Sequence, residues 1–192
     1  MNFTSNYKKL SIGAIALLSA STTIGGVALA DDTMNGTATI TVVAPTTDAL
    51  SLTETPNIDF GTATIGAVSG VLPGTTDKPY TVVDLRGGST GYRVQVEASD
   101  FTLKTDTTKK LPVTAMLLKV ADSTNGELTG TSSDVNVLGQ QGVVLTGGAD
   151  SNGTQVSGDV TAGLTLDGTK VGSLKVGEYQ ATVTHSIVSG VQ

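Results

Sequence analysis

Asp84 and Arg86 are the two residues of this sequence whose charges and spacing best suit recognition chemistry. They stand two positions apart, which places both side chains on one face of an extended strand, directly before the glycine-containing residues 87–91. A carboxylate and a guanidinium placed in this way can form an ion pair that fixes the following loop. Alternatively, the planar guanidinium of Arg86 can hold a carboxylate of a bound ligand. We favour the ion pair and keep both residues as candidate ligand-binding residues.

Tyr92 and His185 are ring side chains that fall on the apolar side of strand-like segments. Residues 92–97 and 179–188 alternate apolar with polar positions. The pattern favours core packing for both rings, and a buried His185 then needs a hydrogen-bond partner. The alternative is a platform on which a sugar stacks, because an aromatic face packs against the C–H surface of a hexose. Tyr92 and His185 therefore complete the set of candidate ligand-binding residues.

No catalytic or metal-binding motif can be assembled from the sequence. It has one histidine, no cysteine, and no serine in the setting of a nucleophile elbow. Carboxylates are plentiful, but a glycosidase pair is defined by a separation in space that a sequence does not give. Asp122, Asn125, Asp150 and Asn152 lie in polar loops, but these loops lack the alternating spacing and the distal glutamate of a calcium-binding loop. We predict a protein that is not an enzyme and that uses no metal and no cofactor.

The first 30 residues have the three parts of a secretory signal peptide. Lys8 and Lys9 precede an apolar run over residues 10–18, and residues 27–30 (Val-Ala-Leu-Ala) supply the small residues that a signal peptidase reads. Polar residues and a glycine pair interrupt the run before it is long enough to span a membrane. We expect cleavage of residues 1–30, secretion, and no membrane insertion of the remaining residues 31–192.

Composition restricts the partners of residues 31–192. Without the leader the chain has nine basic and 17 acidic residues, a net charge of −8, and no basic cluster. This balance argues against nucleic acid and anionic lipid, because each phosphate contact needs a lysine or arginine. Cysteine is absent, so burial and sheet hydrogen bonds must stabilise the fold alone.

Short alternating segments bounded by turn residues recur along residues 31–192, which is the pattern of a sandwich. Residues 111–120 are more uniformly apolar and predict a central strand covered on both faces. Residues 72–76 (Leu-Pro-Gly-Thr-Thr) match the letters of a sorting signal, but we interpret them as a turn. Residues 147–158 are interpreted as flexible. Further strands are expected at residues 37–42, 50–52, 80–85, 92–97, 135–138, 142–145, 164–166 and 179–188. The prediction is all-β: one β-sandwich-like domain of antiparallel strands.

Five segments resemble, in their order along the chain, the conserved elements of the WxL domain, a cell-surface module of low-GC Gram-positive bacteria. Residues 177–184 with the following His185-Ser186-Ile187 look like its C-terminal signature, and residues 56–61 resemble its Pro-x-x-x-Phe-Gly element. Residues 83–87 followed by residues 91–94 resemble its Asp-x-Arg and Gly-Trp-x-Leu elements, and residues 111–118 stand where the family has an apolar strand. The sequence contains no tryptophan, so tyrosine and histidine occupy the first positions of the two name-giving motifs.

The resemblance implies a β-sandwich-like domain that attaches non-covalently to the peptidoglycan of the cell wall. It also implies contact with other cell-surface proteins, because members of the family are exported alongside larger wall-associated proteins. On this basis we expect residues 31–192 to act outside the cell, in wall attachment, adhesion or a surface complex, through a face near Tyr92 and the loop of residues 86–91.

A structural role is the alternative function. A pilin-like or coat subunit assembles by β-strand complementation, in which one copy supplies a strand to the next. The alternating segment that starts at Thr37 is the donor strand that this alternative requires.

Overall fold

The computed structural model describes residues 37–65, 70–88, 90–170 and 174–190, so the expected signal peptide lies outside the described residues. The chain divides into two compact units, residues 1–40 and residues 41–192. Within the described ranges there is no helix of the length and apolarity that a membrane crossing requires.

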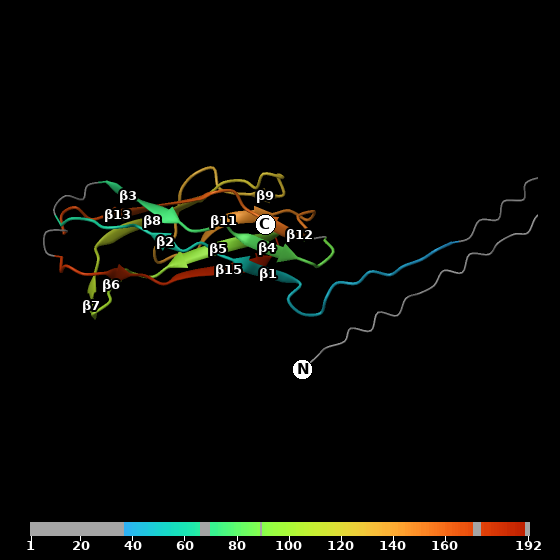
Figure 1. Ribbon diagram of the computed structural model, residues 1–192, viewed down its shortest axis with the longest axis horizontal. Helices are drawn as coiled ribbons and strands as arrows, with labels where there is room; N and C mark the ends of the chain where they lie inside the picture. The colour runs from blue at the N-terminus through green and yellow to red at the C-terminus, as the bar shows by residue number, and fades with distance from the viewer. Residues whose placement is uncertain (1–36, 66–69, 89, 171–173, 191–192) are drawn as a thin grey trace, which may run out of the picture. The chain divides into compact units, whose positions relative to one another are not determined.

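The described residues between 50 and 189 fold into β-strands joined by turns and loops (Figure 1). The described strands are β1 (Leu50–Glu54), β2 (Ile58–Asp59), β3 (Val71–Thr76), β4 (Thr81–Asp84), β5 (Tyr92–Ala98), β6 (Thr102–Leu103), β7 (Asp106–Lys110), β8 (Val113–Val120), β9 (Leu128–Thr129), β10 (Val135–Asn136), β11 (Gly142–Gly147), β12 (Gly153–Val156), β13 (Val160–Leu166), β14 (Tyr179–Gln180) and β15 (Val183–Ser189). All pairings between these strands are antiparallel. The predicted all-β, sandwich-like class is confirmed.

Two of the sheets are linked by short stretches of chain. Their strand orders are β1-β4-β12 and β2-β3-β13-β8-β10. Only a few residues separate β1 from β2, β3 from β4, and β12 from β13, so the same three stretches of chain run through both sheets. The facing sheet has the order β15-β5-β11-β9, and β14-β6-β7 forms a small separate sheet.

The core lies between these layers and is dominated by alternate residues of the central strands. Along β5, Tyr92, Val94, Val96 and Ala98 are fully buried, while the side chains between them are not. Met116, Leu118 and Val120 of β8 join the same apolar cluster from the opposite layer. Apolar and polar residues alternate along these strands because one face of each strand is buried and the other is not, as predicted.

Four sequence-based expectations are wrong in detail. Residues 37–42 form no strand, because a strand needs a hydrogen-bonded neighbour and the described part of the chain gives them none. Residues 72–76 lie in β3, whose Pro73 is tolerated because the neighbouring β2 pairs only with Thr75 and Thr76. Residues 147–158 include β12. Strand β8 is central, but only one of its faces is well buried.

The predicted strand over residues 179–188 is divided in two. Tyr179 and Gln180 pair with β6, and from Val183 onward the chain pairs with β5 instead. The side chains predicted to face the core are only half-buried, at Tyr179, Ala181, Val183, His185 and Ile187. The first four of these line a large groove, which explains their partial exposure.

Candidate functional site

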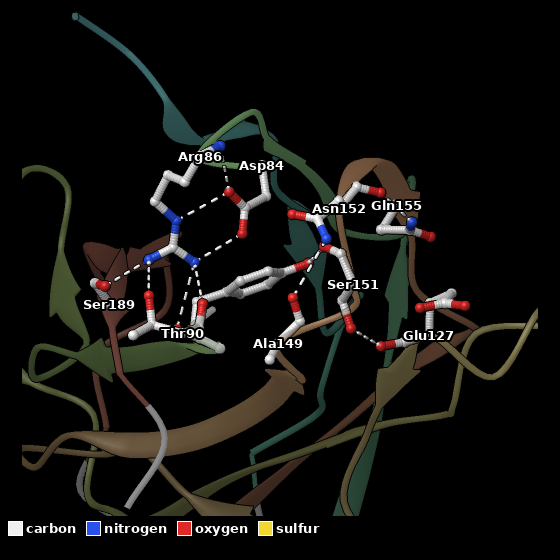
Figure 2. Close-up of polar contacts among 11 residues, drawn as sticks. Asp84, Arg86, Thr90, Glu127, Ala149, Ser151, Asn152, Gln155 and Ser189 are labelled. Atoms are coloured by element: carbon white, nitrogen blue, oxygen red, sulfur yellow. Dashed lines mark hydrogen bonds and ion pairs between the residues drawn. The ribbon is translucent and has the colours of Figure 1, made fainter. Parts of the chain in front are cut away.

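Asp84 and Arg86 meet at the end of β4, as their spacing predicts (Figure 2). Arg86 Nε donates to Asp84 Oδ1 at 2.9 Å, and Arg86 Nη2 donates to Asp84 Oδ2 at 2.7 Å. The backbone N–H of Arg86 also donates to Asp84 Oδ1, at 3.0 Å. Asp84 is 2 % exposed, so this is a largely buried, two-pronged ion pair that also closes the turn after β4.

The remaining N–H groups of Arg86 bond to the protein as well. Nη1 donates to the hydroxyls of Thr90 and Ser189, and Nη2 donates to the carbonyl oxygen of Thr90 at 2.8 Å. All five guanidinium N–H groups thus have an acceptor within the chain. We call Asp84, Arg86, Thr90 and Ser189 the Arg86 clamp, because together they hold the loop of residues 85–91 against the end of β15.

The electrostatics of the clamp follow from these contacts. The hydrogen bonds from Arg86 hold the pKa of Asp84 below its ordinary value, although burial alone would raise it. The same bonds raise the pKa of Arg86 above its ordinary value. Both groups are therefore charged throughout the physiological range, and the favoured interpretation of the pair as a loop-fixing ion pair agrees with the geometry.

Tyr92 is a core side chain beneath this clamp. It is fully buried, and the Arg86 guanidinium carbon lies 5.9 Å from its ring centroid. Gly147 of β11 stands opposite Tyr92 in the register, and a Cβ at that glycine would lie 2.3 Å from the ring. Burial raises the pKa of Tyr92 to about 12. The ring therefore packs between strands and presents no exposed face for stacking.

His185 lies further along β15 and finds its partner in Tyr80. His185 Nδ1 is 3.1 Å from the Tyr80 hydroxyl, and the two rings meet edge to face with centroids 5.5 Å apart. Burial lowers the pKa of His185 and raises that of Tyr80. Burial thus favours the neutral imidazole and the protonated hydroxyl, and the tautomer of His185 decides which of the two groups donates the hydrogen bond. Sequence reasoning predicted that a buried His185 needs such a partner but could not identify Tyr80.

The segments that stand for the two name-giving motifs lie side by side. Strands β5 and β15 pair so that Tyr92 faces Ser189, Val94 faces Ile187 and Val96 faces His185. Residues 92–94 and 185–187 therefore overlap at the Val94–Ile187 pair. The sequence gives no sign of this pairing, because the two segments are about 90 positions apart.

Two glycine-bearing loops form a continuous surface above the clamp. Gly88 adopts φ +56°, and a Cβ there would collide with the side chain of Asn152 and the carbonyl oxygen of Ala149, so Gly88 lies directly against the loop that carries the labelled Ala149 and Asn152 (Figure 2). Leu85 is 49 % exposed, and Thr90 and Asn152 are exposed as well. We call Leu85, Gly87, Thr90, Ala149 and Asn152 the end-loop surface.

The described residues contain no cluster of three side chains suited to holding a metal ion. Comparison with curated proteins and with solved structures gives no match. The family model described as "WxL domain surface cell wall-binding" matches residues 30–186, which is most of the chain and includes residues 92–94 and the first two residues of the second motif segment. This chain therefore belongs to the WxL domain family of surface cell wall-binding domains, and it acts outside the cell, at the cell-wall surface.

Proposed function

We propose that this domain attaches non-covalently to peptidoglycan through the end-loop surface. Its membership of a wall-binding family carries the general function. The observation that supports this particular surface is the Arg86 clamp, in which one guanidinium ties an exposed loop to Asp84 and Ser189. A loop fixed before binding loses little conformational entropy when a ligand arrives.

In this proposal the four candidate residues act beneath the contact surface. Asp84 and Arg86 position the loop, and Tyr92 supports it from below. His185 packs against Tyr80 away from this surface, where it also lines the groove. The groups that touch the polymer are the exposed side chains of Leu85, Thr90 and Asn152. Leu85 offers an apolar contact, and Thr90 and Asn152 can form hydrogen bonds with sugars and peptide stems.

Retention on purified sacculi tests the proposal. The exported protein is mixed with sacculi that retain or lack teichoic acid, and the bound fraction is measured after centrifugation. Removal of the two exposed contacts, in Leu85→Ser and Asn152→Ala, should weaken retention about tenfold for the pair, at about 1.4 kcal/mol in total. Both side chains project to solvent, so the variants should remain folded by circular dichroism.

Gln140→Ala is the matched control for Asn152→Ala. Gln140 is also an exposed amide with one hydrogen bond to a backbone carbonyl, that of Asn136, and it lies outside the end-loop surface. It should bind sacculi as the unchanged protein does. Equal losses in both amide variants, or full retention by the Leu85 and Asn152 variants, would place the wall contact elsewhere.

Contact with another surface protein is the second activity that we propose for the same exposed face. Leu85 is a large apolar side chain exposed beside a rigid loop, which is a feature of protein contact sites. Capture of a surface protein by the unchanged chain, but not by Leu85→Ser, in an assay without sacculi would support it. Capture that is indifferent to the Leu85 substitution would count against this face.

A further inference from the structure

A large, partly apolar groove opens at one edge of the sandwich. Its volume is about 1110 Å³, and its apolar lining includes Phe60, Leu72, Leu111, Leu166, Tyr179 and Val183. The wall on one side is β2 with the residues that follow it, and on the other side it is β14 and the start of β15. Partly buried core side chains therefore face a space that no described strand fills.

Strands at the groove have free edges. β2 and β15 are the terminal strands of their sheets, and β2 has only two paired residues. A terminal strand presents backbone N–H and C=O groups on the side away from its neighbour, and these can pair with an added strand. The groove thus offers both an apolar floor and hydrogen-bonding edges, which are the two things that strand addition requires.

Residues 37–43 have the complementary properties. Their sequence, Thr-Ala-Thr-Ile-Thr-Val-Val, contains no charge and alternates so that Ala38, Ile40 and Val42 share one face of an extended chain. Ile40, Val42 and Val43 are 86 %, 84 % and 80 % exposed. The segment has strong strand-forming residues and no strand partner in the described part of the chain.

We propose that residues 37–43 of one copy of this protein insert as an added strand into the groove of a second copy. Ile40 and Val42 then cover the exposed parts of the groove lining, and the threonines face outward. The segment is long enough to pair with the start of β15, where Val183 and His185 line the groove, and it runs so that Val42 lies beside Ala181. Repeated head to tail, this contact makes a chain of domains, and it does not depend on wall attachment.

A second copy is a better occupant than the chain's own segment. The chain enters β1 at Leu50, beside Asp84, and leaves it at Glu54, directly before residues 55–65 that line the groove. To bring Val42 beside Ala181 in its own groove, the segment would have to reverse and retrace β1, which is about 17 Å long. The six residues between Val43 and Leu50 extend to about 20 Å and include a proline. This connection is barely longer than the strand that it would have to span.

The oligomeric state in solution is the first test. Size-exclusion chromatography with light scattering should show oligomers of the exported protein that grow with its concentration. Ile40→Asp places a charge on the inserted face and should give monomers, whereas Thr39→Asp places the same charge on the outward face and should still assemble. Both changes lie outside the folded strands, so neither should unfold the domain.

Either of two results would overturn the proposal. One is a protein that stays monomeric at every concentration without any substitution. The other is equal behaviour of Ile40→Asp and Thr39→Asp, since the inserted and outward faces would then not differ.

Disulfide trapping is the second test, and it is simple because the chain has no cysteine. Two differently tagged chains, one with Val42→Cys and one with Ala181→Cys in the groove lining, are mixed and oxidised. A covalent heterodimer that fails to form when Ile40→Asp is added to the first chain supports insertion between copies. A bond that forms only within a single chain carrying both cysteines would show that the segment fills its own groove and would refute the proposal.

Discussion

Every N–H group of the Arg86 guanidinium donates a hydrogen bond to an atom of the same chain, so Arg86 acts as a structural part of the loop. This role depends on the planar fork of the guanidinium, which bonds to both oxygens of Asp84 and still reaches Thr90 and Ser189. A lysine ammonium has three N–H groups on a single nitrogen and cannot span these positions. The sequence predicted the Asp84–Arg86 pair from spacing, but Ser189 is 103 positions away from Arg86 and only the fold reveals it.

The substitution Arg86→Lys should therefore lower the free energy of unfolding by about 1–3 kcal/mol, because it leaves buried acceptors without donors. Chemical denaturation of the two proteins at pH 7 measures this difference. Lys104→Ala is the control, since Lys104 forms an exposed ion pair with Glu178 and should cost less than about 1 kcal/mol. Equal losses of stability from the two substitutions would show that the Arg86 clamp stabilises the fold no more than an exposed ion pair does.

His185 should make the domain less stable in mild acid. Burial lowers the pKa of His185 in the folded state below the ordinary value of 6.5, so the unfolded chain binds a proton more readily than the folded one. The stabilisation is complete above about pH 6.5 and is lost as the pH falls through the folded-state pKa, by at most about 1.4 kcal/mol per pH unit.

Unfolding experiments at pH 7.5 and pH 5.5 test this dependence on pH. The unchanged protein should be less stable at pH 5.5, and His185→Gln, which keeps a polar group beside Tyr80 but cannot be protonated, should lose most of the difference. If the unchanged protein is as stable at pH 5.5 as at pH 7.5, this account of His185 fails.

At the scale of the elements, alternation predicted the strands that pair on one buried face and failed where tertiary context decides. Residues 92–97 became β5 because their apolar side chains meet those of β8. Residues 37–42 have the same alternation but no neighbouring strand in the described part of the chain. Pro73 and Gly74 favour a turn by their residue types, yet they lie in strand β3. The groove could not be predicted, because it is a space between elements and belongs to no segment of the sequence.

Packing between β5 and β11 depends on the absence of a side chain at Gly147. A Cβ there would lie 2.3 Å from the Tyr92 ring, so Gly147→Ala should cost about 1–3 kcal/mol of unfolding free energy by overpacking. Gly168→Ala is the control, because a Cβ at Gly168 meets nothing within 4 Å, and its effect should stay within about 0.5 kcal/mol.

A double substitution separates crowding at Gly147 from a general intolerance of the strand. Added to Tyr92→Leu, which removes the ring, Gly147→Ala should cost clearly less than it does alone. An unchanged cost would mean that the ring is not what the added methyl meets.

For the whole molecule, the balance of charge decides how the wall environment affects attachment. Residues 31–192 carry a net charge of −8, and teichoic phosphates are also negative, so the two repel each other. Salt screens this repulsion, because the Debye length falls from about 30 Å at 0.01 M to about 10 Å at 0.1 M. Retention on sacculi that keep teichoic acid should therefore increase with salt over this range, and also toward pH 4.5 as carboxylates begin to take up protons.

Sacculi stripped of teichoic acid are the control for this prediction. Their retention of the protein should change much less with salt, since the repelling phosphates are gone. Retention on untreated sacculi that is indifferent to both salt and pH would show that long-range charge has no part in attachment.

The antiparallel pairing of β1 with β4 has a mechanical consequence for a protein at an outer surface. Residues 41–49 lead directly into β1, which is hydrogen-bonded to β4 from Leu50 to Glu54. Tension applied through those residues along the strand direction strains these bonds simultaneously, in shear, and does not open them one after another. A domain anchored in this way can transmit a pulling force into its centre without losing its first strand.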